Sequence, residues 1–206
     1  MKIGILGAGM IGGTVGRLWR KAGHEVMFGT RHPEKIAALA KELGAATGLP
    51  DVAARFGEVI LFAVPLGAVP DLGRALGKDV VGKVVLDASN AYPQRDGDAA
   101  HAAKEFAGGS SAWVASLLPG ARVVKAFNAV NYKTLEREAH HSDLGIPVAS
   151  DDPGALELVE QLVRDAGFRP VIVGPLESGK RFEPGTPVYN TGMSAAALTE
   201  ALELPR

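Results

Sequence analysis

Apolar residues in the first thirty positions follow the period of a strand, then of a helix, then of a second strand. Lys2 to Leu6 form a short run with the length and composition of a buried strand. The apolar residues that come next recur at helical spacing and share one helix face, namely Ile11, Val15, Leu18, Trp19 and Ala22. Glu25 to Phe28 again have strand character. This order of elements predicts a βαβ unit of about thirty residues.

Strand and helix patterns continue to alternate along the rest of the chain. Further strands are expected at 58–64, 83–86, 122–126, 146–149 and 170–173. Further helices are expected at 33–43, 69–76, 111–118, 153–166 and 194–202, with another that ends near residue 139. Residues 91–109 lack a regular pattern, and we interpret them as a surface loop with a short helical piece.

This alternation predicts an α/β fold with a doubly wound, Rossmann-type parallel sheet. Residues 1–130 are expected to form the nucleotide-binding domain, and residues 131–206 a short C-terminal α/β extension packed on the same unit. The tail after residue 174 is rich in Gly and Pro, and its apolar residues are difficult to bury within one compact unit. We therefore expect a homodimer in which the tail packs near the partner or over the cleft. The apolar tail residues are Phe182, Val188, Tyr189, Met193 and Leu198.

The turn between the first strand and the first helix has the pattern G-x-G-x-x-G. In this pattern Gly7 permits a tight turn, Gly9 lets the backbone approach a pyrophosphate, and Gly12 lets helix and strand pack closely. Met10 and Ile11 begin the helix, whose free N–H groups and dipole favour an anion. A glycine turn without a ligand is the alternative. The position of the G-x-G-x-x-G pattern inside a βαβ unit favours a dinucleotide site over this alternative.

Cationic residues follow the second strand, where an NAD-preferring enzyme usually carries an acidic residue for the ribose hydroxyls. The chain has Thr30 and Arg31 at this place, and Lys35 one turn further on. Cations at a helix N-terminus are unfavourable unless an anion offsets them. The 2′-phosphate of NADP is such an anion, so we expect NADP(H) rather than NAD. A solvated surface arginine is the alternative.

Small residues follow two other expected strands. Ligands of doubly wound sheets lie beyond the carboxyl ends of the strands. Ala63, Val64 and Pro65 are therefore expected to line the adenosine and ribose side of the cleft. Ser89 and Asn90 follow the next strand, where they either approach the nicotinamide ribose and carboxamide or serve as ordinary turn residues.

Composition narrows the classes of function. The chain has 206 residues, a formal net charge of −1 and 47% hydrophobic residues, so no basic excess points to nucleic acid. No apolar run approaches the roughly 18 residues of a membrane span, and no segment resembles a leader, so we expect a cytoplasmic protein. The sequence has no cysteine, which excludes disulfides and thiolate chemistry. His140 and His141 lack neighbours at metal-ligand spacing, so we expect no metal site.

Seven segments carry a family resemblance. They are the glycine turn at 7–12, Thr30-Arg31, Val64-Pro65, DASN at 87–90, VVKAFNAV at 123–130, IPVASDDPGA at 146–155 and GPLESGKRFEP at 174–184. With these segments, nearly the whole chain resembles the family of NADP oxidoreductases that act with coenzyme F-420, a deazaflavin. It is also similar to the NADPH-binding domain of the six-transmembrane ferric reductases. The last three segments are absent from ordinary Rossmann enzymes.

The resemblance implies roles for individual residues. Thr30 and Arg31 would hold the 2′-phosphate of NADP. Gly9, Met10 and Ile11 would hold the pyrophosphate. Three residues would lie near the nicotinamide and its hydride acceptor, namely Lys125, Phe127 and Asn128.

The residues offer no obvious pair for proton transfer to a carbonyl substrate. Tyr132 and Lys133 are adjacent and do not have the spacing of a dehydrogenase dyad. Lys125 is either a charge-balancing group in the cleft or a core-edge lysine. Hydride transfer to a deazaflavin or flavin needs little beyond ring alignment, because the cofactors supply the chemistry. We therefore expect an NADPH-dependent oxidoreductase with a small-molecule hydride acceptor. A non-catalytic NADP(H)-binding redox sensor and a reductase of a small carbonyl or imine are the alternatives.

Overall fold

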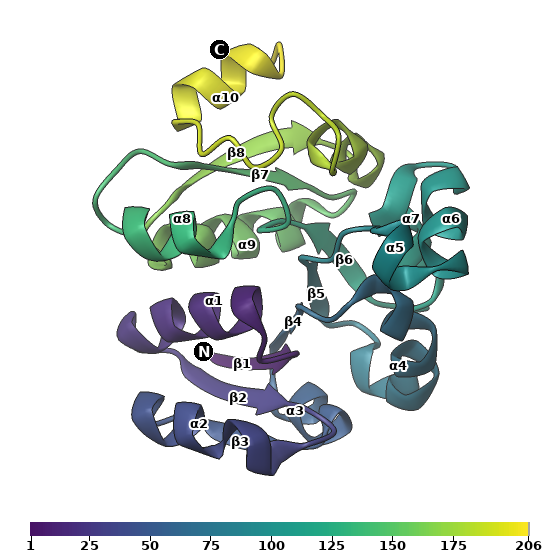
Figure 1. The fold of residues 1–206 in the computed structure, drawn as a ribbon, viewed down its shortest axis with the longest axis vertical. Helices are drawn as coiled ribbons and strands as arrows, with labels where there is room; N and C mark the ends of the chain where they lie inside the picture. Colours follow the sequence, from purple (N-terminus) through teal and green to yellow (C-terminus); the bar gives the residue numbers. More distant parts are fainter. Residues whose placement is uncertain (206) are drawn as a thin grey trace.

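The computed structural model of the protein describes residues 1–205 as an eight-stranded sheet with helices on both faces (Figure 1). The strand order is β3-β2-β1-β4-β5-β6-β7-β8. The first six strands are parallel and have the order of a doubly wound sheet, which confirms the predicted fold class. β7 joins β6 in the antiparallel direction, and β8 runs parallel to β7.

The elements have the following bounds. The strands are β1 (Lys2–Leu6), β2 (Glu25–Gly29), β3 (Ala46–Gly48), β4 (Val59–Phe62), β5 (Val84–Asp87), β6 (Arg122–Lys125), β7 (Gly145–Ala149) and β8 (Arg169–Gly174). The α-helices are α1 (Met10–Lys21), α2 (Ala37–Leu43), α3 (Pro50–Phe56), α4 (Val69–Leu76), α5 (Pro93–Asp96), α6 (Asp98–Glu105), α7 (Gly109–Ser116), α8 (Tyr132–Glu138), α9 (Pro153–Asp165) and α10 (Ala195–Ala201). The 3-10 helices are η1 (Pro33–Ile36), η2 (Leu66–Ala68), η3 (Gly77–Val80) and η4 (Leu176–Phe182).

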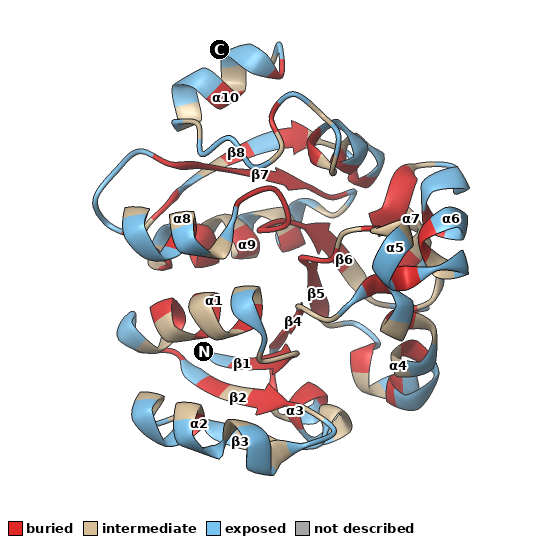
Figure 2. Cartoon of the chain, viewed as in Figure 1, coloured by how far each residue is buried: buried red, intermediate tan, exposed pale blue. Residues whose placement is uncertain are grey.

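The central strands are buried on both faces (Figure 2). Side chains alternate across the sheet, so Ile3 and Ile5 pack into the core under α1, α8 and α9, whereas Leu6 packs with Ile60 and Phe62 toward α3 and α4. Burial of each such side chain contributes about 1.5–3 kcal/mol. The near-continuous apolar runs of β4 and β5 follow from this double coverage.

Trp19 fixes α1 to the C-terminal half of the chain. Its indole Nε1 donates a 2.8 Å hydrogen bond to the Leu162 carbonyl of α9. Its ring meets Phe127 edge-on at 5.9 Å, and Phe127 in turn meets Phe168 at 6.3 Å. Phe127 is fully buried and has a positive φ of 62°, a conformation that costs a non-glycine residue energy and that this packing stabilises. Phe127 therefore lies in the core.

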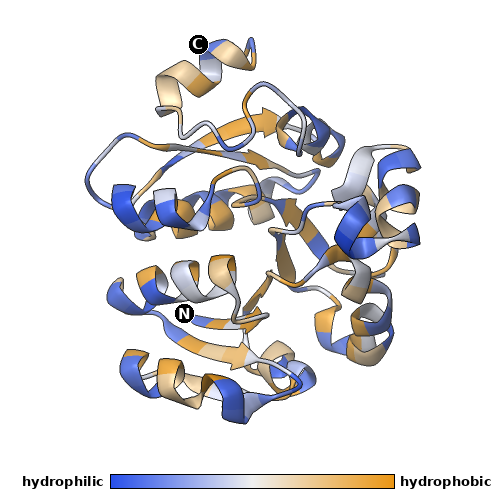
Figure 3. Cartoon of the chain, in the orientation of Figure 1, coloured by the Kyte–Doolittle hydropathy of each residue, from blue (hydrophilic) through white to orange (hydrophobic). Residues whose placement is uncertain are grey.

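Two stretches differ from the sequence-based expectation. β3 and α3 occupy residues 46–56, to which the pattern assigned no element. Residues 91–109, expected to be mainly loop, contain α5 and α6 and the start of α7. In α6 the buried residues are Ala100 and Ala103, and the rest of its surface is largely hydrophilic (Figure 3). Such small buried side chains leave almost no periodic signal.

The tail packs within the same chain. Phe182, Val188 and Leu198 are buried together with Val171 and Val173 of β8. The reason given for a homodimer, that these apolar residues lack cover, is therefore wrong. The sheet is continuous from β6 to β7, and a division of the chain at residue 130 stays a prediction. Within residues 1–205, no helix is both long and apolar enough to cross a membrane.

Candidate functional site

The three glycines of the turn after β1 have different surroundings. Gly7 has a φ of 97°, which favours glycine. A Cβ on Gly12 would lie 1.9 Å from the Gly7 carbonyl oxygen, so this helix position fits glycine alone. A Cβ on Gly9 would meet no atom within 4 Å. The space beside Gly9 is therefore open to a ligand.

The N-terminus of α1 has neither a capping side chain nor a nearby negative charge. Gly9 is its N-cap, so no side chain caps the helix, and its first turn has no acidic residue. Uncapped N–H groups and the helix dipole together favour a bound anion. This end of the cavity fits a pyrophosphate.

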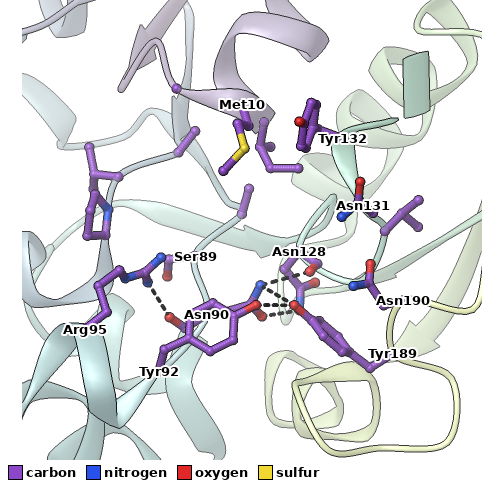
Figure 4. Close-up of a pocket in the computed structure, with 17 residues that line it drawn as sticks. Met10, Ser89, Asn90, Tyr92, Arg95, Asn128, Asn131, Tyr132, Tyr189 and Asn190 are labelled. Carbon is purple, nitrogen blue, oxygen red and sulfur yellow. Dashed lines mark hydrogen bonds between the residues drawn. The ribbon is translucent and has the colours of Figure 1, made fainter. Parts of the chain in front are cut away.

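A cavity of about 330 Å³ lies beyond the carboxyl ends of β1, β4, β5 and β6 (Figure 4). It spans the gap between β1 and β4, where the strand order reverses and where doubly wound proteins bind ligands. The structure brings many of the expected site residues to its wall, namely Gly9, Met10, Ile11, Ala63, Val64, Pro65, Ser89, Asn90 and Asn128. Gly7 and Gly12 shape the turn behind this wall.

The residues expected to bind a 2′-phosphate lie at the end of β2. The Thr30 backbone N–H pairs with Gly48 of β3, and its hydroxyl accepts a 3.2 Å hydrogen bond from the His32 N–H. Arg31 and Lys35 are exposed, and no carboxylate within residues 1–205 forms an ion pair with either. Two cations without a protein partner fit an incoming phosphate. Their contact with NADP stays a prediction.

Lys125 lies beneath the cavity. Its side chain is fully buried at the end of β6, and it does not line the cavity wall. Its ammonium donates hydrogen bonds to Ser110 at 3.0 Å and to Ser111 at 2.9 Å. Glu183 lies 3.5 Å and Asp87 3.8 Å from the same nitrogen. A buried cation is thus matched by two carboxylates, as burial of charge requires.

The hydroxyl protons complete this network. Ser110 donates to Glu183 at 2.5 Å, and Ser111 donates to Asp87. The other Asp87 oxygen accepts the hydroxyl of Ser89 at 2.6 Å and its backbone N–H at 2.9 Å. Each serine beside Lys125 therefore accepts from the ammonium and donates to a carboxylate. The network joins the tail, α7 and β6 to Ser89 in the cavity wall.

Two asparagine amides cross the cavity floor in a fixed orientation. Asn128 Nδ2 donates to the Phe182 carbonyl and to Asn90 Oδ1, both at 3.1 Å. Asn90 Nδ2 donates to the Asn128 carbonyl at 2.9 Å. Because backbone carbonyls only accept, neither amide can be flipped. Asn128 Oδ1 is left as a buried acceptor without a hydrogen-bond partner within residues 1–205. It fits an N–H donor of a ligand such as a carboxamide, at the cost of a small rearrangement.

The sequence analysis assigned no site role to Tyr92, Arg95, Tyr132 or Tyr189, which also line the cavity. Tyr92 directly precedes α5 and Tyr189 belongs to the tail, and their hydroxyls are hydrogen-bonded to each other (Figure 4). Arg95 lies 4.8 Å from the centre of the Tyr92 ring. Tyr132 lines the opposite side, so all three tyrosines of the sequence reach this one cavity. No motif joins residues so far apart, and the scarcity of tyrosine was the one available signal.

The surroundings hold these groups in defined states. Burial and the hydrogen bond to Tyr92 raise the pKa of Tyr189 well above its ordinary value, so its hydroxyl stays protonated. Burial alone would raise the pKa of Asp96, but hydrogen bonds from Arg95, Gly67 and Tyr92 outweigh it and lower that pKa. Ionised Asp96 therefore fixes both the Arg95 guanidinium and the Tyr92 backbone. The cavity thus contains a hydrogen-bonded pair of hydroxyls, and the expectation that the residues offer no proton-donor pair stays a prediction.

No group of three or more His, Asp or Glu side chains within the described part of the chain is placed to hold a metal ion. His140 and His141 are exposed at the end of α8.

Comparison with known proteins supports the class of NADP-dependent oxidoreductase, with the hydride acceptor unspecified. Residues 2–91 match the model of the family described as "NADP oxidoreductase coenzyme F420-dependent". The F420-dependent NADP reductase of Methanothermobacter thermautotrophicus is 28% identical over 91% of this chain and 89% of its own length. The resemblance inferred from the sequence is confirmed.

Metalloreductase STEAP3 of Rattus norvegicus is 29% identical over 88% of this chain, and the chain spans 36% of that protein. The similarity to the ferric-reductase domain is thereby confirmed as well. A solved structure of a hypothetical protein from Sinorhizobium meliloti has a TM-score of 0.80 and 25% identity, over 94% of this chain and 95% of that one.

Proposed function

We propose that the protein transfers hydride between NADP(H) and a deazaflavin such as coenzyme F-420, or a flavin-like acceptor. The main support is a cavity at the β1/β4 switch point, with a backbone-lined anion site at one end and tyrosines at the other. Arg31 and Lys35 support NADP over NAD. The names of the relatives support the same reaction class.

The cavity residues fit the nucleotide in two places. The open space at Gly9 and the uncapped start of α1 suit the pyrophosphate. The acceptor-only oxygen of Asn128 suits an N–H donor at the far end. When bound, NADPH supplies the hydride. The protein binds and orients the two ring systems and excludes water from between them.

A reductase of a small carbonyl or imine is the second candidate. The hydrogen-bonded hydroxyls of Tyr92 and Tyr189 favour it, because such a substrate needs a proton as well as a hydride. A non-catalytic sensor of NADP(H) is the third candidate, and no feature of the cavity singles it out.

The test follows NADPH absorbance with coenzyme F-420, FMN, FAD, ferric chelates, and simple ketones and imines, each offered separately. Fast oxidation with the deazaflavin or a flavin is expected. Turnover with carbonyl or imine substrates alone would favour the second candidate, and tight binding without turnover the sensor. A Gly9→Val variant is the control for NADPH oxidation outside the site.

The expected homodimer and cytoplasmic location stay predictions. Since the tail is buried within one chain, light scattering at micromolar concentration is the direct check of the dimer.

A further inference from the structure

The far end of the cavity has few groups that can exchange a proton. Among the described lining residues, the titratable side chains are Tyr92, Tyr132, Tyr189 and Arg95. Arginine keeps its proton under all ordinary conditions. The Ser89 hydroxyl is directed at Asp87. The source of a proton at this end is therefore a tyrosine.

The amide chain across the floor bears on the direction of the tyrosine hydrogen bond. Asn90 Nδ2, oriented by the Asn128 carbonyl, donates to the Tyr189 hydroxyl oxygen at 3.4 Å. Either hydroxyl of the Tyr92–Tyr189 pair can be the donor, and we take Tyr189 as the donor because its oxygen already accepts from Asn90. In this arrangement the Tyr92 proton is shared with no other residue among 1–205 and is available to the cavity.

Negative charge that develops on Tyr92 has two stabilising neighbours. With Tyr189 as donor, its hydroxyl donates to the Tyr92 oxygen, and the Arg95 guanidinium lies 4.8 Å from the Tyr92 ring centre. Arg95 is held in place by Asp96, at 2.9 and 2.8 Å, and by the Asn90 carbonyl at 2.9 Å. Developing negative charge at Tyr92 thus faces an oriented donor and a fixed cation.

We propose that Tyr92 is the catalytic acid of the reduction, with Tyr189 as its positioning residue. This inference rests on the proposed function. Hydride adds to a carbon of the acceptor, and the electron pair moves to a ring nitrogen or to the nitrogen or oxygen of the reduced double bond. The O–H bond of Tyr92 breaks, its proton passes to that atom, and the phenolate regains a proton from solvent. The products are the oxidised nicotinamide and the acceptor with one hydride and one proton added.

The bridge has a second consequence for specificity. Tyr92 directly precedes α5, and Tyr189 belongs to the tail. Their hydrogen-bonded hydroxyls close the side of the cavity opposite Met10 and Tyr132 (Figure 4). An acceptor that places its proton-accepting atom beside Tyr92 is reduced, and one that cannot reach Tyr92 lacks the proton.

The experiment compares Tyr92→Phe, Tyr189→Phe and the control Ser116→Ala. The control removes a hydroxyl outside the cavity, which donates to the Trp113 carbonyl at an exposed position. With whichever acceptor the wild type reduces, Tyr92→Phe should lower kcat by about a hundred-fold or more. Tyr189→Phe should lower it by about ten-fold, the loss of one hydrogen bond to a charged group. Ser116→Ala should leave kcat unchanged, and NADPH affinity should be the same in all four proteins.

A second measurement is independent of turnover. Tyrosinate absorbance is titrated in the nucleotide-free proteins. Removal of Tyr92 should move the Tyr189 transition to lower pH, because the hydrogen bond that raises the pKa of Tyr189 is lost. The Ser116→Ala control should leave the Tyr189 transition in place.

The outcomes are distinct. If the wild type is active and the Tyr92→Phe variant is equally active, this inference alone is overturned. The same holds if the Tyr189 transition stays at the same pH after Tyr92 is replaced. A wild type that binds NADPH and reduces no acceptor would overturn the proposed function and the catalytic role with it.

Discussion

The two ends of the cavity are built in different ways. The pyrophosphate end consists of backbone from one short segment, Gly7 to Gly12, held between β1 and α1. The acceptor end consists of side chains from distant segments, with Tyr92 and Tyr189 separated by 97 residues. The first end is specified by local sequence, and the second by the tertiary fold.

Because of this difference, we expect one end of the cavity to bind the nucleotide and the other end to determine which acceptor is reduced. Backbone N–H groups bind a phosphate through charge and shape, which suits a part common to dinucleotide-binding βαβ folds. Side chains at the other end are free to vary without disturbing that part. A change at one end should therefore leave the function of the other end intact. Four sets of variants, in order of decreasing expected effect, test this separation.

The largest effect is expected at Lys125, beneath the acceptor end. Lys125→Met leaves Asp87 and Glu183 buried without their cation, so it should lower the free energy of unfolding by about 3–5 kcal/mol. Urea unfolding measures the loss. Lys83→Met is the matched control, since this half-buried lysine caps α3 through the Ala54 and Gly57 carbonyls and should contribute about 1–2 kcal/mol. Equal losses in the two variants would show that the network has no special role.

The glycine turn should respond position by position. Gly9→Val places a side chain in open space, so the fold should persist while NADPH affinity falls about a hundred-fold or more, roughly 3 kcal/mol. Gly12→Ala forces a Cβ against the Gly7 carbonyl and should cost about 3 kcal/mol or more in stability. Fluorescence titration and thermal melts separate the two. Retained NADPH affinity in folded Gly9→Val protein would contradict the assigned role of the turn.

The preference for NADP should depend on Arg31. Arg31→Ala should raise the NADPH dissociation constant by about ten- to hundred-fold, since a charge-assisted contact contributes about 1.5–3 kcal/mol. The NADH dissociation constant should stay the same. Arg17→Ala is the control, because Arg17 pairs with Glu42 on the surface. Equal losses of affinity for NADPH and NADH would show that Arg31 does not act on the 2′-phosphate.

The smallest effect is expected far from the cavity, at the start of α9. Hydrogen bonds from Arg122 and from the Ala155 N–H hold the pKa of Asp152 well below its ordinary value. A depressed pKa contributes stability above pH ~4, which is lost as the pH falls through the folded value. Asp152→Asn should therefore lower the urea midpoint at neutral pH and have little effect in strong acid. Asp143→Asn, at an exposed pair with Arg169, should show no such pH dependence.

The elements that the sequence predicted are those with large apolar side chains at regular spacing. α1 and α9 have broad buried faces, and the helices expected at 33–43 and 153–166 end at Leu43 and begin at Pro153 as the pattern predicted. β3 has three residues and α3 buries only Ala53 and Ala54, so neither repeats a hydrophobic signal. The antiparallel direction of β7 leaves no trace in composition.

The site divides in the same way. Gly9 and Asn90 follow strands, so their positions at the sheet edge follow from the fold class. Phe127, next to Asn128 in the chain, has a positive φ and points into the core against Trp19. Lys125 lies beneath the cavity wall, where its ammonium is 3.5 Å from the carboxylate of Glu183, a residue far away in the sequence. Side-chain direction at a strand end depends on these distant partners.

The contact between Lys125 and Glu183 also has a consequence for the order of folding. Contacts between distant residues form slowly, because the chain loses loop entropy before the contact stabilises it. During synthesis the glycine turn has its partners once residue 63 has emerged, whereas the acceptor end must wait for residue 189. An unfinished chain therefore acquires its nucleotide end first, and the completed tail closes the other end last.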